Sequence, residues 1–271
     1  MADAVQRSVV GAWRRLLPLT PVAAIVALAS LACAAWPVAP DRLDPARAWC
    51  SPSAARPLGC GEAGVDLLAL VSHAELRGVA LAALVAVAGF VIGTPLGAAA
   101  ALSRGRFERA VARTCDLLQA FPTFLLALVV LSAVRSPARV HLGFVFGLTA
   151  WAPFARLALA QTRVLRDAAF VEAAWALGVS RAGVLARHIL PNLLEVVAVQ
   201  LGSTGAFIVV SEAALSFVGL GPRDGVSLGS VLDQGVAAML RAPHVLIAGS
   251  LSVFLTSVAM LVAGRAAAGL K

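Results

Sequence analysis

The sequence predicts an all-α membrane protein with six transmembrane helices. Hydrophobic residues make up 60% of the 271 residues, and charged residues only 13%. Soluble domains carry about 25% charged residues, so this chain has too few charges to cover a soluble globule of its size. Its charged residues also lie mostly in short segments between long apolar runs. This arrangement is typical of a polytopic membrane protein.

The net charge of +8 does not by itself indicate nucleic-acid binding. The arginines lie between the apolar runs, where basic side chains contact lipid headgroups and fix the orientation of the spans. We therefore expect membrane lipid as a partner, and no nucleic acid.

The first apolar run, 18–40, is free of charge and follows a polar, basic N-terminus at 1–17. At about 1.5 Å per residue, this run can cross the roughly 30 Å hydrocarbon core of a bilayer. A cleaved signal peptide is the alternative, since 34–36 would tolerate cleavage, but the run is longer than a usual signal core. Segment 41–77 holds several prolines and glycines with charges of both signs, and is predicted to be a loop.

Segment 78–264 is predicted to be a five-helix core. Its apolar runs are 78–102, 117–134, 141–160, 192–215 and 244–264. In the first of these runs, Gly89, Gly93 and Gly97 are spaced by four residues. Small residues at this spacing let two membrane helices approach closely.

The connections between these spans differ in length and polarity. Segment 103–116 is a short basic connector, and 135–140 is a tight turn. Pro122 falls in the first turn of its span, where proline costs little. The longest polar connection, 161–191, precedes the fifth span, and residues 265–271 form a short tail.

An even number of spans places both termini on the same side of the membrane. Fourteen basic residues lie on the side of the termini and eight lie on the other side. Cytoplasmic loops carry the excess of lysine and arginine. We therefore expect 1–17, 161–191 and 265–271 in the cytoplasm, and 41–77 on the opposite side of the membrane.

Two of the four cysteines, Cys50 and Cys60, lie in the loop predicted to be external. They could form a disulfide there, because disulfides persist in oxidising compartments. Two free thiols are the alternative, and the sequence leaves both open.

The sequence contains no arrangement of residues that predicts catalysis. The four histidines are scattered, and the HExxH, GxSxG and GxxxxGK[ST] motifs are absent. We therefore expect no enzyme activity, no cofactor, no metal and no ATP bound through a P-loop. The centres of the predicted spans hold no carboxylate, although a proton- or sodium-coupled carrier usually needs one. Glu212 comes nearest, and we expect it to contact a helix end or loop.

The first half of 161–191 is patterned as a short helix. Asp167 is a candidate N-cap, and Phe170, Ala174 and Leu177 share one face at helical spacing. An exposed apolar-faced helix of this kind either docks in the groove of a partner protein or lies on the membrane surface. The pattern alone leaves both open.

The second half of the same segment predicts another short helix. Gly178 can supply the left-handed residue that ends the first helix. Ser180 can cap a second helix that runs through His188, and Pro191 then returns the chain to the membrane. Two short helices are thus expected to meet at a glycine bend.

This hairpin resembles the EAA loop of ABC-importer permeases. The resemblance rests on Glu172-Ala173-Ala174, then Gly178, then Leu190-Pro191 at matching spacing. The form HILPN (188–192) is similar to the dipeptide/oligopeptide/nickel subfamily, and other stretches agree. These stretches are IGTPLG (92–97), QAFPTFLLAL (119–128) and SEAALSFVGLG (211–221). The chain looks like the second permease of such systems, which has the longer external loop.

The resemblance implies a permease fold in the plasma (inner) membrane of a bacterium, and a set of partners. Two permeases, expected to be a heterodimer, form the pathway for peptides or a related small solute. Each permease inserts its EAA helix into a cleft on one of two cytoplasmic ATPase subunits, which bind the ATP. An extracytoplasmic binding protein delivers the substrate. The ATPase-coupling residues are then Glu172, Ala173, Ala174, Gly178, Leu190 and Pro191.

The resemblance also assigns a role to each of the central residues. Ala173 and Ala174 keep the docking face thin, and Gly178 permits a bend that a side chain would strain. Glu172 pairs with a polar group of the ATPase or orients the loop. The alternative is a non-transport membrane scaffold or receptor whose hairpin docks a partner protein, and a secondary carrier is a weaker third possibility.

Overall fold

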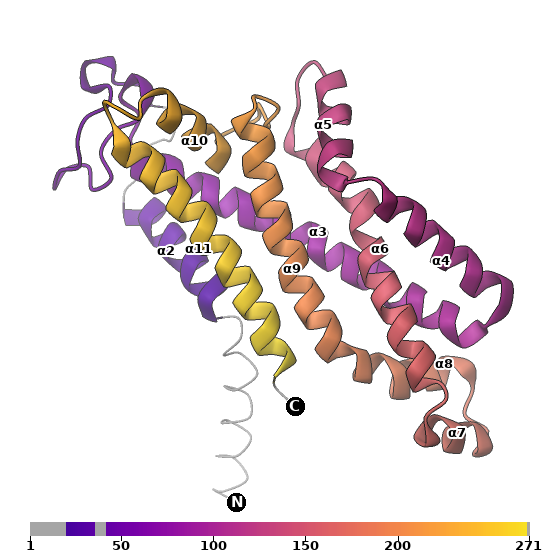
Figure 1. The fold of residues 1–271 in the computed structure, drawn as a ribbon. Coiled ribbons are helices and arrows are strands. Elements are labelled where there is room, and N and C mark those ends of the chain that lie inside the picture. The colour runs from indigo at the N-terminus through magenta and orange to yellow at the C-terminus, as the bar shows by residue number, and fades with distance from the viewer. Residues whose placement is uncertain (1–19, 36–41, 270–271) are drawn as a thin grey trace, which may run out of the picture.

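The computed structural model describes residues 20–35 and 42–269, and within them the regular structure is helical (Figure 1). This confirms the predicted all-α class. The predicted N-terminal segment 1–17 lies outside the described residues. The predicted first span, 18–40, is described only as α2 (Thr20–Ala35), which is apolar and 16 residues long.

The remaining helices follow in chain order. They are α3 (Leu67–Ser103), α4 (Gly105–Ala120), α5 (Thr123–Ala133), α6 (Arg139–Leu165), α7 (Ala169–Ala176), α8 (Arg181–Val184), a π-helical turn η4 (Leu185–Ile189), α9 (Leu190–Phe217), α10 (Leu228–Ala237) and α11 (Pro243–Ala268). Two short 3₁₀ turns, η2 (Pro45–Arg47) and η3 (Glu62–Gly64), lie in the segment before α3. The predicted tail at 265–271 thus begins as helix.

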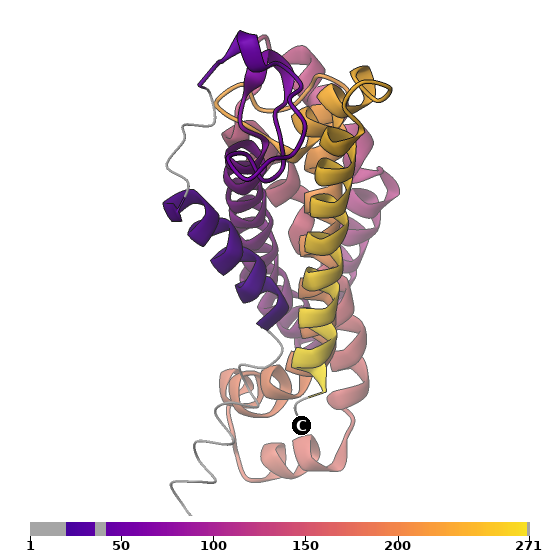
Figure 2. The same ribbon diagram turned by 90° about the vertical axis from the view of Figure 1, so that its left-hand side faces the viewer.

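Within the described residues, four helices are long and apolar enough to cross a membrane, or five if a bent pair is one span. The four are Leu67–Ser103, Arg139–Leu165, Arg181–Phe217 and Pro243–Ala268. Six spans were predicted. Counting the bent pair as one span gives five, and α2, a shorter apolar helix, is the remaining candidate. The long helices run between the two ends of the molecule (Figures 1 and 2).

The predicted third span, 117–134, is not a single straight helix. Instead α4 and α5 meet at 65°, with Phe121 and Pro122 extended at the break. The basic connector predicted for 103–116 is therefore corrected to helix. Its charges obscured an amphipathic pattern in which Val111 and Cys115, four residues apart, are buried on one face.

The predicted loop 41–77 is shorter than expected, because α3 begins at Leu67. Asp66 caps this helix, its carboxylate accepting the backbone N–H groups of Leu68 and Ala69 at 3.0 and 3.1 Å. The remaining loop carries a disulfide between Cys50 and Cys60. The structure thereby resolves the two alternatives that the sequence left open.

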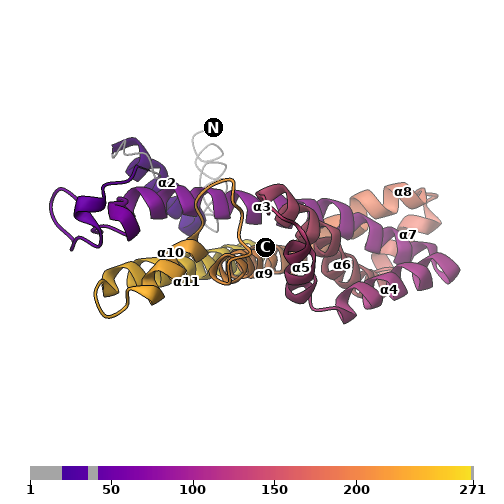
Figure 3. The same cartoon turned by 90° about the horizontal axis from the view of Figure 1, so that it is seen from above.

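The glycine stripe of α3 places this helix directly against α6, as Figure 3 shows from above. A Cβ atom added to Gly93 or Gly97 would overlap the carbonyl oxygens of Trp151 and Ala155, respectively. One added to Gly89 would lie 2.8 Å from a carbonyl oxygen of α6. The predicted close approach is confirmed, and α6 is the partner.

We predict that Gly97→Ala destabilises the folded protein and that Gly147→Ala does not. The first change forces backbone apart in a packed interface, which costs roughly 1–3 kcal/mol. Gly147, in α6, has no atom within 4 Å of an added Cβ, so alanine there gains roughly 0.5–1 kcal/mol of helix stability. Thermal unfolding midpoints in detergent measure both, and equal midpoints would refute the packing account.

Candidate functional site

The hairpin with the predicted site residues lies at the end of the molecule opposite the disulfide loop (Figures 1 and 2). Two side chains hold α7 there: Val171 is fully buried, and Ala174 is 4% exposed. They pack in one cluster with residues of α3, α6, α8, η4 and α9. These are Ala98, Phe154, Ala158, Val184, Ile189, Leu193 and Val197. The short helix is thus fixed to the ends of three long helices.

The outward side of α7 is apolar and exposed. Phe170 is 44% exposed, Trp175 38%, and Leu177, just beyond the helix, 84%. Ala173 and Glu172 are also on the outside. Sequence reasoning missed Trp175, although a tryptophan in a polar connection was an available signal. Two aromatic rings and a leucine at this end of the molecule form a surface suited to a partner's groove.

The structure corrects the predicted position of Ala174. It was expected to share an outer face with Phe170 and Leu177 and to keep the docking surface thin. It lies instead in the core, because α7 turns Val171 and Ala174, three residues apart, toward α6 and α9. Only Ala173 of the alanine pair remains on the outer surface.

The bend between the two short helices has the geometry that the sequence predicted. Gly178 has φ +77°, and its N–H bonds to the carbonyl of Trp175 at 3.0 Å. The Val179 N–H reaches the carbonyl of Ala174 at 3.1 Å, which completes a Schellman motif. No atom lies within 4 Å of a Cβ added to Gly178. The position therefore needs glycine for its backbone conformation rather than for space.

The second short helix begins as predicted but does not end after His188. Ser180 caps it by accepting the Gly183 N–H at 3.2 Å. The helix then continues from Arg181 to Phe217 as one span. Proline lacks the N–H of a helical residue and crowds the carbonyl four residues earlier. The π-turn η4, closed by the Leu190 N–H on the Leu185 carbonyl, widens the helix directly before Pro191.

The predicted coupling residues therefore occupy three places. Glu172, Ala173 and Gly178 lie on the outer surface, and Ala174 lies in the core. Leu190 and Pro191 lie in the first turn of α9, directly after the π-turn. The prediction that Asp167 caps α7 is wrong, because the N-cap residue is Ala168.

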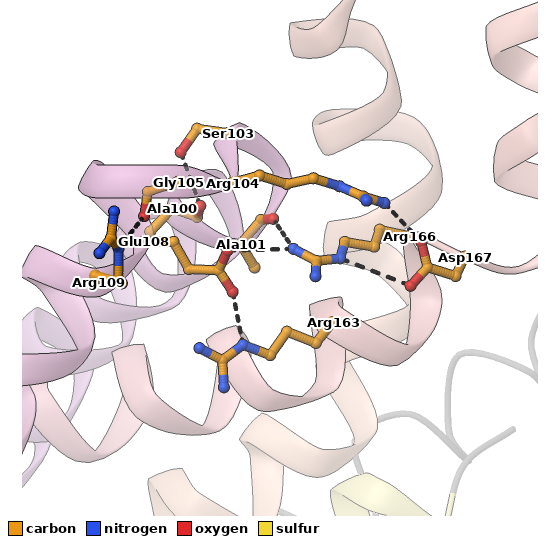
Figure 4. Close-up of polar contacts among 10 residues, drawn as sticks. All are labelled: Ala100, Ala101, Ser103, Arg104, Gly105, Glu108, Arg109, Arg163, Arg166 and Asp167. Carbon is orange, nitrogen blue, oxygen red and sulfur yellow. Dashed lines mark hydrogen bonds and ion pairs between the residues drawn. The ribbon is translucent and has the colours of Figure 1, made fainter.

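Asp167 instead belongs to a polar network at the base of α7 (Figure 4). Its carboxylate pairs with Arg104 at 2.7 Å, and both side chains are 62% exposed. This contact joins the α3–α4 corner to the residues between α6 and α7. Because it is open to solvent, we expect it to contribute little stability.

A second and better-shielded part of the network centres on Glu108, which is 8% exposed. Its carboxylate accepts from Arg163 Nε at 2.6 Å and from Arg166 Nη1 at 3.3 Å. The same Arg166 nitrogen donates to the carbonyl of Ala101 at 2.5 Å. Three helices, α3, α4 and α6, are thereby tied together directly before α7 (Figure 4). Sequence reasoning missed Glu108 because it read the segment as a basic connector.

Two carboxylates lie inside the helical bundle. Glu212, near the outer end of α9, is 5% exposed, and its Oε2 is 3.1 Å from the position of an added Cβ on Gly78. Glu75, assigned from the sequence to the loop, lies in α3 and accepts a hydrogen bond from Thr256 in the middle of α11. The expectation of carboxylate-free span centres is corrected accordingly. Within 20–35 and 42–269, no three His, Cys, Asp or Glu side chains cluster to hold a metal ion.

The chain matches, over residues 93–268, the model of a family described as binding-protein-dependent transport system inner membrane component. The chain belongs to this family. It is therefore a permease subunit and a multi-pass inner membrane protein, and its resemblance to ABC-importer permeases of the peptide type is confirmed.

Curated relatives agree with the family. The chain is 32% identical over 214 residues to the glutathione transport system permease protein GsiD of Pectobacterium atrosepticum, covering 79% of this chain and 71% of the relative. The GsiD proteins of Shigella dysenteriae serotype 1 and Escherichia coli O157:H7 are 36% and 35% identical over 179 residues. Those matches cover 65% of this chain and 58% of each relative.

We predict that Glu108→Ala destabilises the protein and that Asp167→Ala does not. Removing the Glu108 carboxylate leaves two arginines without their acceptor, at a cost of roughly 1.5–3 kcal/mol. Removing the exposed Asp167 pair costs about 1 kcal/mol or less. Thermal unfolding in detergent compares the two variants. A Glu108→Ala midpoint at or above that of Asp167→Ala would show that the network does not hold the base of α7.

Proposed function

We propose that this chain forms half of the translocation pathway of an ABC importer and is coupled to ATP hydrolysis through α7. The observation that carries the proposal is the two-sided character of this helix. Its inner side is fixed to α3, α6 and α9, and its outer side exposes Phe170, Trp175 and Leu177. A partner that grips the outer side moves the long helices with it.

A protein groove accounts for this outer surface better than a lipid surface. An interfacial helix relies on basic side chains along its polar face, whereas α7 itself carries Glu172 and no basic residue. Its exposed aromatic and leucine side chains are the anchors that a helix-in-groove contact uses. Ala173 beside them allows close approach of a partner's backbone.

The proposed assembly supplies what this chain lacks. ATP is bound and hydrolysed by two cytoplasmic ATPase subunits, each of which holds the hairpin of one permease. A second, different permease completes the pathway, and an extracytoplasmic binding protein delivers the substrate. The curated relatives are named as glutathione transport permeases, which supports a peptide or a related small solute as the cargo.

The proposed orientation places both termini and α7 in the cytoplasm. The basic residues support it, because fourteen lie on that side and eight on the other. The C-terminal end of α11 points toward the end of the molecule that carries α7 (Figures 1 and 2). The disulfide Cys50–Cys60 lies at the opposite end, in keeping with an oxidising compartment outside the membrane.

We predict that Leu177→Asp strongly weakens ATPase association and that Leu240→Asp leaves it unchanged. Leu177 is 84% exposed at the α7 end, and Leu240 is 97% exposed beyond α10 at the opposite end. Both variants replace an exposed leucine by the same charge, so folding is affected alike. Loss of a central anchor costs about 2 kcal/mol or more, on the order of 30-fold in affinity.

Co-purification of tagged permease with its P-loop ATPase measures this difference. Unchanged association for Leu177→Asp would contradict docking through α7. Failure of the unaltered chain to retain any ATPase would favour the alternative, a membrane scaffold or receptor whose hairpin binds another protein.

For orientation, a membrane-impermeant thiol reagent should label Cys50 and Cys60 from outside after reduction. The other cysteines, Cys33 and Cys115, are first replaced by alanine so that the signal reports only the loop. Intact spheroplasts should be labelled, and inverted vesicles should not. Labelling confined to inverted vesicles would place α7 outside the cytoplasm and end the proposal.

A further inference from the structure

A cavity of about 340 Å³ opens between α6 and α9, beside the corner where α4 turns into α5. Its size falls within the range of small-molecule sites. Half of its ten lining residues carry a polar side chain: Thr123, Thr149, Gln200, Ser203 and Thr204. None of the ten is charged.

The polar side chains of the cavity lie near the middle of two membrane-length helices. Thr149 and Thr204 are 5% and 8% exposed. Gln200 Nε2 donates to the Thr204 hydroxyl at 3.1 Å, which leaves the amide oxygen of Gln200 and a second N–H for another partner. Polar side chains at this depth face the bundle interior or a water-filled path. The polar residues of the cavity therefore mark the side of the molecule that faces away from lipid.

The backbone around the cavity also offers hydrogen-bonding groups. Pro153 lies inside α6, and it has no N–H to donate to the carbonyl of Thr149 one turn earlier. On the opposite wall, α5 begins at Thr123, and the first amides of a helix have no acceptor within that helix. Interrupted helices with exposed backbone groups near mid-membrane are where transporters hold their substrates.

We propose that this cavity is a binding site on the translocation path, and that it binds the amide backbone of a peptide-like solute. Peptide amides present donors and acceptors together, as do Gln200, Thr204 and the backbone groups of α5 and α6. The neutral lining would accept solutes with different side-chain charges. The inference rests on the proposed function, and it names the surface of this subunit that the cargo meets.

The test uses Ser203→Cys in the assembled importer, with Cys33 and Cys115 replaced by alanine. Ser203 lines the cavity, and its hydroxyl bonds to the carbonyl of Val199. Ser257→Cys is the matched control, because Ser257 lies in α11, outside the cavity lining, and makes the same bond to Val253. The probes are a small neutral maleimide, with the dipeptide Ala-Ala or S-methylglutathione as protectant.

We expect the maleimide to label Ser203→Cys and either peptide to slow that labelling at least threefold, whereas neither peptide alters Ser257→Cys. Labelling without protection by either peptide would overturn the proposal, since the cavity would be open but not recognise amides. Absence of labelling would also overturn it, because the second permease would then fill the cavity.

A second variant, Gln200→Leu, removes the amide without changing the size of the side chain greatly. We expect it to raise the peptide concentration for half-maximal uptake about tenfold while ATPase association stays normal. Normal uptake would overturn the proposal. The two proposals fail in different ways. If coupling through α7 is wrong, the unaltered chain does not retain the ATPase. If the cavity proposal is wrong, the ATPase is retained but the peptide effects on labelling and uptake are missing.

Discussion

The burial of Val171 and Ala174 against α3, α6 and α9 is the contact on which the proposed coupling through α7 depends. An eight-residue helix has too few internal hydrogen bonds to be stable alone in water. Its shape is therefore imposed by the cluster beneath it, in which Val171 is fully buried. This anchoring turns α7 from a surface loop into a rigid extension of the long helices.

The surrounding contacts reinforce that anchoring from two sides. Glu108 and its arginines tie α3, α4 and α6 together directly before α7, and the Schellman bend at Gly178 fixes the exit. Farther along, the glycine stripe of α3 brings its backbone against α6. In the proposed coupling, a displacement of α7 moves α6 and α9, the two helices that also line the proposed solute cavity.

The sequence predicts the elements in which local chemistry decides the outcome. Gly178 and Ser180 act through their own backbone and cap geometry, and the spacing of Gly89, Gly93 and Gly97 reports a close helix contact directly. The family resemblance rested on residues of the hairpin, and the matched region, 93–268, includes that hairpin.

The remaining features depend on contacts between distant segments, which local patterns do not encode. The charges near the start of α3 led to the prediction of a loop. Glu75 is nevertheless helical, and its partner Thr256 lies far away in the sequence, on α11. The basic residues of α4 concealed a helix that packs on α6. The 65° angle between α4 and α5 depends on contacts with other helices, which the local sequence does not show. Ala174 could be placed on α7, but only the packed structure shows that it points inward.

The central claim is that α7 moves with its own helices rather than swinging on its loop. Spin labels at Ala176→Cys on α7 and Glu195→Cys on α9, both exposed, in a chain whose Cys33 and Cys115 are alanine, measure this directly in the assembled importer. The account predicts the same distance distribution between the two labels with and without a non-hydrolysable ATP analogue. A distribution that shifts or broadens when the analogue binds would contradict it.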